Sequence, residues 1–340
     1  MLRLPAEWEM QDVIQLTLPH EETDWNDMLE EAQACFREIA QQISRHQKLL
    51  LVCHNINNVK QWLYGLKGDN VFFAEIPSND TWARDHGGIT IYQDEKPLIL
   101  DFTFNGWGLK FASALDNEIT LKLEKAGFFG NTPVETTGYV LEGGSIESDG
   151  QGTIMTTTAC LLSYHRNPSL NQQQIEEKLK EWFGASRILW VTEGELEGDD
   201  TDAHIDTLAR FCSPSRIAYV SCEDPEDPHY SSLKKMEEEL KAFRQADGSP
   251  YELFPLPMAT PQFDPEDGHR LPATYANFLI MNEAILLPTY GDEIRDQQAL
   301  EIMQKACPAH RIIGINCNAL IKQHGSLHCV TMQYPAGSFL

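Results

Sequence analysis

Basic residues are scarce in this sequence, and their scarcity limits the partners that the protein can have. Lysine and arginine together number 26 against 51 aspartates and glutamates, which gives a formal net charge of −25 at pH 7. Because such a field repels polyanions, we expect neither nucleic acids nor anionic membrane surfaces as partners. The same field attracts a small cation, although an excess of acid also serves simply to keep a protein in solution.

Long apolar runs are missing as well. No segment approaches the ~20 apolar residues that a membrane-spanning helix needs. Residues 1–20 interrupt their apolar positions with Arg3, Glu7, Glu9 and Asp12, so they lack the apolar core of a signal peptide. The composition, with 42% hydrophobic and 23% charged residues, is that of a folded globular protein. We therefore expect a cytoplasmic protein.

The sequence also lacks cysteine and histidine patterns with metal-binding or redox spacing. The eight cysteines include no CxxC pair, and no HExxH motif is present. Several cysteines lie in apolar runs, as Cys53 does in residues 51–53, so we expect mostly buried free thiols.

No linker rich in glycine, serine or proline divides the chain, which predicts one domain over residues 1–340. A loose unit of strand, turn, apolar strand, amphipathic helix and strand recurs instead. Its predicted copies are strands 139–141, 152–155 and 187–192 with helix 171–182; strands 204–211 and 216–220 with helix 231–243; and strands 284–288 and 311–315 with helix 293–305. Strands 88–93 and 97–104 form a predicted hairpin, and strands 13–18 and 48–53 with helix 22–45 are predicted to join strand 327–332. About five units that join first to last favour a closed α/β ring around a central site, and an open α/β sheet fits the alternation nearly as well.

Four segments cluster polar residues and glycines beside the predicted strands: residues 79–88, 141–144, 200–206 and 324–329. In the third, Asp202, His204 and Asp206 alternate, so on an extended strand they share one face. Burying three such groups is costly unless partners or a ligand satisfy them. His204 alone would suit a satisfied polar network or an exposed strand face, whereas the three together favour a functional site.

Two kinds of chemistry fit these segments. A metal could bind to Asp202, His204 and Asp206, or to His324, His328 and Cys329, but neither set has a recognised ligand spacing. Cys329 follows a Gly-Ser turn and His328 and leads into strand-like residues, where a thiol is reachable and a nearby histidine can assist it. Thiol chemistry is therefore favoured over a metal.

Taken together, the motifs resemble the agmatine deiminase branch of the guanidino-group modifying enzymes, which also contains bacterial peptidylarginine deiminases. The resemblance extends from Trp82 to Cys329. It rests on Trp82-Ala83-Arg84-Asp85, Phe104-Asn105-Gly106-Trp107-Gly108, Glu142-Gly143-Gly144, Asp149-Gly150 with Gly152-Thr153, Arg166-Asn167-Pro168, Asp202-Ala203-His204-Ile205-Asp206 and His328-Cys329. Two segments depart from the family: Gly87-Gly88 stands where Gly-Pro is common, and residues 323–327 lack the usual run of glycines with an asparagine.

The resemblance implies a single catalytic domain with a five-bladed α/β propeller (pentein-type) fold and pseudo-fivefold symmetry. It implies hydrolytic deimination of agmatine to N-carbamoylputrescine and ammonia, a step of polyamine (putrescine) biosynthesis, through a covalent cysteine thiouronium intermediate. No metal and no cofactor would be needed. Deimination of arginine or peptidyl-arginine, and a non-catalytic polyamine- or guanidinium-binding protein, are the alternatives. The partner would be a small cationic guanidinium substrate, and homo-oligomer formation stays open.

The resemblance also assigns roles to individual residues. Cys329 would be the nucleophile and His204 the general acid and base. Asp85 and Asp206 would hold the guanidinium, and Glu142 would lie beside His204, orienting it and contacting the guanidinium. The substrate would also contact Trp82, which suits a core anchor equally well, and Asp200. Arg84 is expected to form a salt bridge inside the scaffold.

Overall fold

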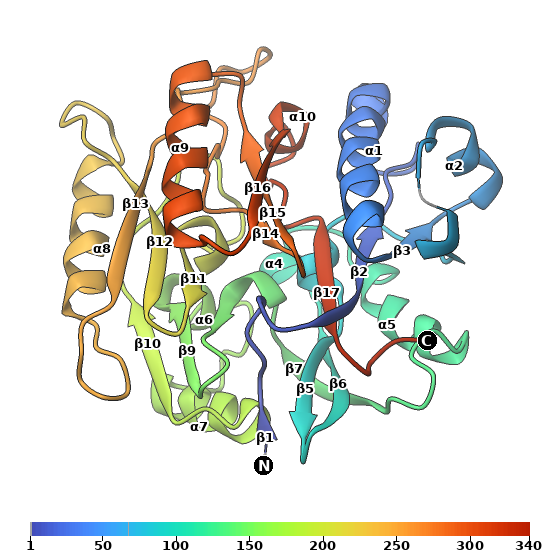
Figure 1. Ribbon diagram of the computed structural model, residues 1–340, viewed down its shortest axis with the longest axis horizontal. Helices are drawn as coiled ribbons and strands as arrows, with labels where there is room; N and C mark the ends of the chain where they lie inside the picture. Colours follow the sequence, from blue (N-terminus) through green and yellow to red (C-terminus); the bar gives the residue numbers. More distant parts are fainter. Residues whose placement is uncertain (1, 67) are drawn as a thin grey trace.

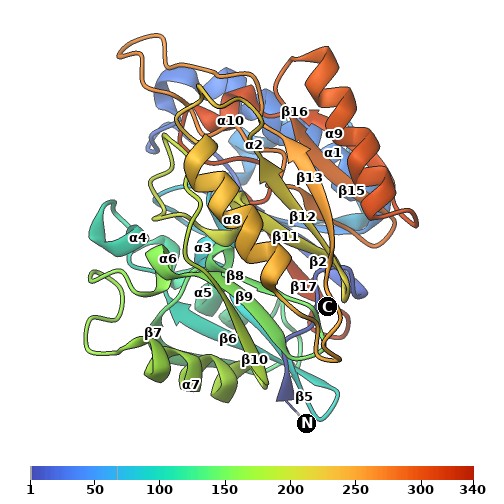
Figure 2. The same cartoon turned by 90° about the vertical axis from the view of Figure 1, so that its left-hand side faces the viewer.

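The computed structural model describes residues 2–66 and 68–340, and it is a mixed α/β structure. In this part of the chain the strands form five small sheets. The long helices lie on the outside of the molecule, with the sheets between them and the centre (Figures 1 and 2). No helix among the described residues is long and apolar enough to cross a membrane.

All five sheets contain the same unit: two antiparallel strands, a connection that includes a helix, and a third strand parallel to the second. Three of them consist of this unit alone. They are β8 (Ile146–Ser148), β9 (Thr153–Thr157) and β10 (Arg187–Val191) with α7 (Gln172–Phe183); β11 (Ala209–Ser213), β12 (Arg216–Ser221) and β13 (Glu252–Pro257) with α8 (Tyr230–Ala242); and β14 (Leu279–Ile280), β15 (Ala284–Thr289) and β16 (Arg311–Asn316) with α9 (Glu293–Ala306). The unit predicted from hydrophobic periodicity is therefore present.

The other two sheets each carry one additional strand. They are β5 (Ile89–Gln93), β6 (Lys96–Thr103) and β7 (Val134–Val140) with α5 (Ile119–Lys125) and the added strand β1 (Leu2–Arg3); and β17 (Thr331–Pro335), β2 (Gln11–Thr17) and β3 (Lys48–Cys53) with α1 (Leu29–His46) and the added strand β4 (Val71–Glu75). β17 pairs with β2, as Thr331 opposite Leu16 shows, so the predicted joining of the two ends of the chain is confirmed. The remaining short helices are α2 (Ile56–Trp62), α3 (Ala83–His86), α4 (Gly106–Leu109), α6 (Thr158–Leu161) and α10 (Asn318–Ile321).

Local sequence explains the long helices. In α1 the buried residues Ala32, Phe36, Ile39 and Ile43 recur every three or four positions, which gives the helix one apolar face toward the core. Helix α7 begins with a capping box and ends at Gly184, whose φ of 64° suits glycine. The apolar face of α1 and the caps of α7 thus follow from the local sequence.

One predicted pairing and the extents of two predicted strands are wrong; the predicted strand 327–332 shares only Thr331 and Met332 with β17. Residues 139–141 do not pair with 152–155: they belong to or follow β7, which pairs with β6, and β8 is the hairpin partner of β9. The predicted strand 204–211 begins only at Ala209, because Ile205–Thr207 forms a 3-10 helix and Asp202 and Ala203 have φ angles of 66° and 59°. Asp202, His204 and Asp206 therefore do not share the face of a strand.

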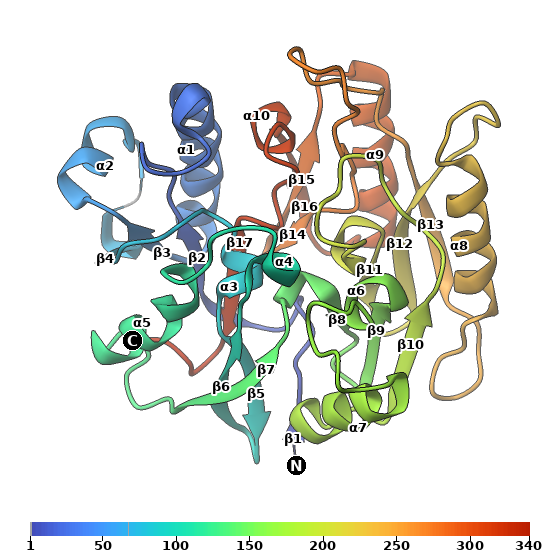
Figure 3. The ribbon, with the colours of Figure 1, turned by 180° about the vertical axis from the view of Figure 1, so that it is seen from behind.

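One relationship in the topology locates the candidate site. In every sheet, a polar residue that lies near the centre of the molecule comes shortly before the first strand of the antiparallel pair. The five are Asp85 before β5, Glu142 before β8, Asp206 before β11, Asn277 before β14 and Cys329 before β17. Figure 3 shows α3, which carries Asp85, near the middle of the molecule.

Candidate active site

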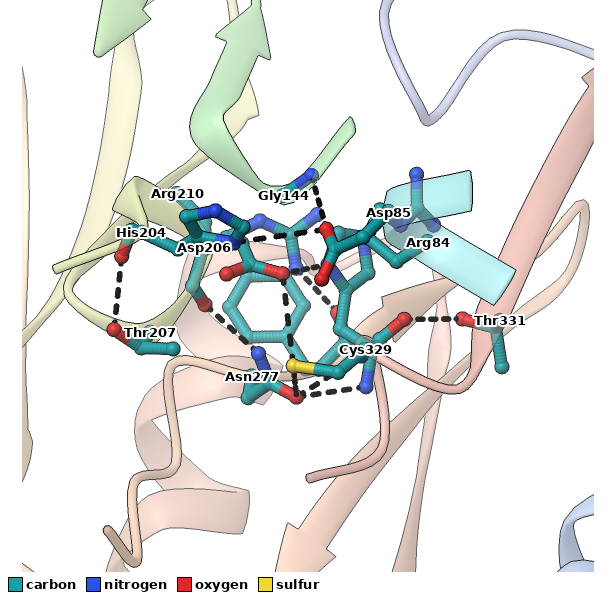
Figure 4. Close-up of polar contacts among 12 residues, drawn as sticks. Arg84, Asp85, Gly144, His204, Asp206, Thr207, Arg210, Asn277, Cys329 and Thr331 are labelled. Atoms are coloured by element: carbon teal, nitrogen blue, oxygen red, sulfur yellow. Dashed lines mark hydrogen bonds and ion pairs between the residues drawn. The ribbon is translucent and has the colours of Figure 1, made fainter. Parts of the chain in front are cut away.

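The Cys329 thiol lies at the centre of this cluster and is buried. Its Sγ is 3.3 Å from Asn277 Oδ1 and 4.0 Å from Asp206 Oδ2 (Figure 4). Burial raises the pKa of the Cys329 thiol well above its ordinary value, and the charges of Asp206 and Asp85 raise it further. Without a bound cation, the thiol is therefore protonated at neutral pH.

Asp85 is held by two donors. Trp107 Nε1 donates to Oδ2 at 2.9 Å, and the backbone N–H of Gly144 donates to Oδ1 at 3.0 Å. Burial raises the pKa of Asp85 to about 6, and the neighbouring Asp206 adds to this effect. The N–H of Arg84 donates to the carbonyl of Cys329 at 3.1 Å, which ties the Asp85 segment to the thiol.

Asp206 has one occupied and one vacant carboxylate oxygen. Its Oδ2 lies 2.7 Å from His328 Nδ1, whereas the buried Oδ1 has no hydrogen-bond partner among the described residues. Burial alone would raise the pKa of Asp206, but the contact with His328 and the charges of His204 and Arg210 lower it overall. An ionised carboxylate with a vacant oxygen is suited to a cationic ligand with N–H donors.

The His204 ring is also buried and lies close to the Asp85 carboxylate. Its Nδ1 is 3.6 Å from Asp85 Oδ1, beyond hydrogen-bond distance, and neither ring nitrogen has a hydrogen-bond partner in the described part of the chain. Burial lowers the pKa of His204, but its neighbours, chiefly Asp85 and then Cys160 and Glu142, together outweigh burial, and the pKa is raised well above its usual value. The ring is thus a protonated acid at neutral pH.

Glu142 lies beside His204, as expected, but its hydrogen bonds go elsewhere. Both carboxylate oxygens accept from Arg166 Nε at 2.9 Å. The donor atoms of Glu7, Glu147 and His328 lie within 4.8 Å of one another, and so do those of Glu142, Cys160 and His204, the group next to Asp85. Because Arg166 already neutralises Glu142, this group is a poor place for a further cation.

Asp202 does not belong to the centre. Its carboxylate accepts from Arg166 Nη1 at 2.6 Å and from Lys110 Nζ at 2.8 Å. Asp202, His204 and Asp206 therefore do not form the metal-ligating set that their alternation suggests. Arg84 has the expected structural role, with its Nη2 3.8 Å from Glu7 Oε2.

A pocket opens above the thiol and is strongly acidic. Its described lining contains no lysine or arginine. It is lined by Asp24, Asp80, Trp82, Asp85, Trp107, Phe111, Asp200, Thr201, Gln323, His324, Gly325 and Cys329. The pocket thus brings the predicted substrate residues Trp82, Asp85 and Asp200 together with Cys329.

Trp82 is both a core anchor and part of the pocket wall. Its Nε1 donates to Asp80 Oδ2 at 2.9 Å, and only 5% of the residue is exposed. Gly325 packs against the ring so closely that a Cβ on this glycine would lie 2.1 Å from Trp82 Cζ3. The departure from the family in residues 323–327 therefore still supplies a glycine where the indole needs it.

Asp200 is half-buried in the pocket wall. Burial raises the pKa of its carboxyl to about 6, while the neighbouring His324 lowers it and Asp199 raises it. His324 Nδ1–H donates to the carbonyl of Gly198 at 2.8 Å. A cation at this point would gain a carboxylate partner without displacing an existing salt bridge of Asp200.

Sequence reasoning missed Asn277, Arg166 and Trp107 as parts of the site. Arg166 and Trp107 stand within motifs that the sequence analysis identified, but without a role. Asn277 stands in no motif, although its position before β14 corresponds to that of the other central residues. Its Oδ1 accepts the N–H of His328 at 2.9 Å and that of Cys329 at 3.3 Å.

A buried thiol between two carboxylates and an imidazole, beneath an acidic pocket, is the arrangement expected of cysteine-dependent enzymes that act on guanidinium groups. The chain belongs to the family of Porphyromonas-type peptidyl-arginine deiminases, whose model matches residues 3–335. The family predicted from the motifs is therefore confirmed.

Individual relatives match the chain over nearly its whole length. A solved protein of Porphyromonas gingivalis, proposed to be an arginine deiminase, is 50% identical, with a TM-score of 0.95 and 100% of each chain covered. A C. jejuni agmatine deiminase variant with substrate bound is 42% identical, with a TM-score of 0.93, covering 99% of this chain and 97% of that one. A candidate agmatine deiminase of Marinomonas sp. is 34% identical over 351 residues, covering 98% of this chain and 94% of the relative.

Proposed function

We propose that the protein hydrolyses agmatine to N-carbamoylputrescine and ammonia. The observation that carries this proposal is the pocket itself: it has the Cys329 thiol at its base, Asp85 on its wall and Asp206 Oδ2 4.0 Å from the thiol, and its described lining contains no lysine or arginine. Such a pocket favours a ligand that is cationic at both ends, and agmatine has a guanidinium at one end and an ammonium at the other. The named agmatine deiminase of C. jejuni, 42% identical, supports the same substrate.

The two carboxylates account for guanidinium binding. Guanidinium is planar and offers N–H donors in a fixed geometry that matches carboxylate oxygens. Asp206 offers its vacant Oδ1, and Asp85 lies on the other side of the cluster, held by Trp107 and Gly144. With the plane fixed, one face of the guanidinium carbon is presented to Cys329.

Substrate binding activates the nucleophile. The charges of Asp85 and Asp206 raise the pKa of Cys329, and a bound guanidinium offsets both charges. The thiol then loses its proton to solvent water, and the thiolate attacks the guanidinium carbon, forming a C–S bond and a tetrahedral adduct as the C–N π electrons move to nitrogen. His204, protonated beforehand, gives its proton to the departing nitrogen, and ammonia leaves with the broken C–N bond.

The remaining thiouronium on Cys329 is hydrolysed in a second step. The neutral His204 takes a proton from water, and the hydroxide adds to the same carbon. The C–S bond then breaks as the hydroxyl proton of the adduct passes to the departing sulfur, which returns the thiol and releases the ureido product. Glu142 binds Arg166 and lies beside His204, so its charge helps to keep His204 protonated. None of these steps calls for a metal or an organic cofactor.

The far end of the pocket favours agmatine over arginine. Arginine adds a carboxylate next to its amine, and this carboxylate would face Asp200 with no cationic side chain in the described lining. Like charges brought together in this way cost on the order of several kcal/mol. The 50% identical protein of P. gingivalis, proposed to be an arginine deiminase, and the description of the family as peptidyl-arginine deiminases make arginine or peptidyl-arginine the second candidate.

We also propose that the five sheets are the blades of a propeller with pseudo-fivefold symmetry. The support is that each sheet repeats one strand unit and delivers one central residue just before its first antiparallel strand. An axis through Cys329 and its neighbours would relate these positions.

An ammonia-release assay on agmatine, free arginine and a peptidyl-arginine tests the function. Of the three substrates, we expect agmatine to give the highest kcat/KM. The Cys329→Ala variant should release no ammonia from any of them. Binding of agmatine without ammonia release would instead identify a polyamine-binding protein. Trapping the Cys329 adduct by rapid quench and mass spectrometry tests the covalent intermediate.

A further inference from the structure

We propose that His328 is a positioning residue for Asp206, in a clamp that Glu7 from the amino-terminal segment completes. The inference deepens the proposed function and rests on it, because Asp206 matters here as the guanidinium ligand. Neither His328 nor Asp206 lines the pocket above the thiol, but Asp206 Oδ2 is 4.0 Å from Cys329 Sγ, so His328 acts through Asp206.

The geometry of His328 carries the proposal. Its Nδ1 is 2.7 Å from Asp206 Oδ2, and its Nε2 is 2.7 Å from Glu7 Oε2. An ionised carboxylate only accepts hydrogen bonds, so both ring nitrogens must donate. The ring is therefore an imidazolium, held by two charge-assisted hydrogen bonds in opposite directions. All three side chains are at least nine-tenths buried.

Glu7 is fixed from the other side. Its Oε2 accepts from Arg210 Nη2 at 2.7 Å, and its Oε1 accepts the N–H of Ile280 at 2.7 Å. The charges that face His328, Asp206 and Glu7 from the surrounding elements are those of Asp85, Glu147, His204, Arg84 and Arg210. Burial alone would raise the pKa of Glu7, but Arg210 and His328 lower it far below its usual range. Glu7 is thus an anion that cannot turn away from the imidazole.

The clamp sets the position of the reacting groups. It occupies Oδ2 of Asp206 and leaves Oδ1 vacant for the substrate. Cys329 is the next residue after His328, and Asn277 accepts the backbone N–H of both. The separation of the thiol from the Asp206 carboxylate is therefore determined by a contact that includes a residue near the start of the chain.

Two substitutions separate charge from position. His328→Asn keeps a donor near Asp206 but removes the positive charge, so the pKa of Asp206 rises. An opposite charge nearby lowers a carboxyl pKa by about 1–3 units, so the loss of kcat/KM relative to the unmodified protein should be larger at pH 6 than at pH 8.5. Glu7→Gln removes an anion and leaves the cations near Asp206, so it should raise KM without this acid-side bias.

The double variant tests whether Glu7 acts through His328. If it does, Glu7→Gln combined with His328→Asn loses no more activity than His328→Asn alone. Glu9→Gln is the matched control, because Glu9 lies in the same segment and pairs with Arg3 at 2.7 Å, outside the site. It should leave both kinetic constants unchanged. Multiplying losses, or an equal loss from His328→Asn at pH 6 and pH 8.5, would overturn the clamp and leave only a structural role.

A readout without catalysis separates the clamp from the proposed function. In protein labelled with ¹⁵N-histidine, the resonances lost in His328→Asn identify His328, and they should show that both ring nitrogens carry a proton. A neutral ring would refute the clamp even in an active enzyme. An unmodified protein that releases no ammonia from any guanidinium, yet shows the doubly protonated ring, would refute the proposed function and leave the clamp intact.

Discussion

The backbone N–H of Gly144 donates to Asp85 Oδ1 at 3.0 Å, and this contact requires the absence of a side chain on Gly144. A Cβ at this position would lie 2.6 Å from His204 Nδ1, 2.8 Å from Asp85 Oδ1 and 3.1 Å from Asp206 Oδ2. Gly144 thus stands where three of the proposed active-site side chains meet. The second glycine of the Glu-Gly-Gly motif is therefore required because no side chain fits at position 144.

Gly144→Ala should therefore inactivate the enzyme. Because the methyl group pushes apart the acid and the guanidinium ligands, we expect kcat/KM to fall by about 100-fold or more. Gly68→Ala is the control, since a Cβ there meets no described atom within 4 Å. Activity of Gly144→Ala close to that of the unmodified protein would show that this cluster is not the reacting centre.

Cys329→Ala should abolish ammonia release while the melting temperature changes little. The substitution removes only a sulfur from the base of the pocket, and no other described group there is a nucleophile of this kind. Cys222→Ala is the control, because the Cys222 thiol donates a hydrogen bond to the carbonyl of Asp224 and does not line this pocket. Retained turnover in Cys329→Ala would contradict the proposed mechanism.

Alkylation and chelation distinguish a thiol from a metal. Because the pKa of Cys329 is raised, iodoacetamide should inactivate the free protein slowly at pH 7 and faster as the pH rises toward 9. Prolonged treatment with EDTA should leave activity intact. If chelation removed activity and zinc restored it, the neighbouring donors of Glu142, Cys160 and His204 would be the place to look for the ion.

The acid limb of the pH profile should report Asp85. Burial raises the pKa of Asp85 to about 6, and the hydrogen bond from Trp107 opposes this rise by stabilising the ionised form. Only the ionised form binds guanidinium, so kcat/KM should fall as the pH drops below about 6. Trp107→Phe removes the donor, raises the pKa further and should move the limb to higher pH by about one unit.

Trp190→Phe is the matched control for that experiment. The Nε1 of Trp190 donates to Glu176 Oε1 at 2.8 Å. Trp190→Phe therefore removes the same kind of hydrogen bond, from an indole to a carboxylate, outside the active-site pocket. An acid limb that moved equally in both variants, or in neither, would show that Asp85 does not set it.

The repeating unit could be predicted from the sequence because its apolar periods change from two to about 3.6 at each helix. The alternation of Asp202, His204 and Asp206 gave a wrong strand for a physical reason. Asp199 accepts from Thr201 Oγ1 at 2.6 Å and from the N–H of Ala203 at 2.7 Å, so side-chain bonds hold a loop. Such local competition with the strand leaves no periodic signal.

The site was predictable where motifs cover it and not elsewhere. Cys329, His204, Asp85 and Asp206 stand in dense polar segments, and the fold brings them together. Asn277 lies among apolar residues, and its place before β14 becomes meaningful only when the sheets are aligned. Glu7 reaches His328 across 321 positions of sequence, a contact that no local pattern encodes.

Asp200 is expected to choose between agmatine and arginine. It faces the pocket without a salt bridge of its own carboxylate among the described residues, and its backbone carbonyl, not its side chain, accepts from Lys110 Nζ at 2.5 Å. Asp200→Asn removes one negative charge and keeps the shape, so KM for agmatine should rise by about tenfold, which corresponds to about 1.4 kcal/mol. The penalty for the carboxylate of arginine should fall, so the ratio of kcat/KM for agmatine to that for arginine should shrink. Asp27→Asn, at an exposed acid outside the pocket, should leave the ratio unchanged. If the unmodified protein hydrolysed arginine with the same kcat/KM as agmatine, Asp200 would not discriminate between the two substrates. An unaltered ratio in Asp200→Asn would lead to the same conclusion.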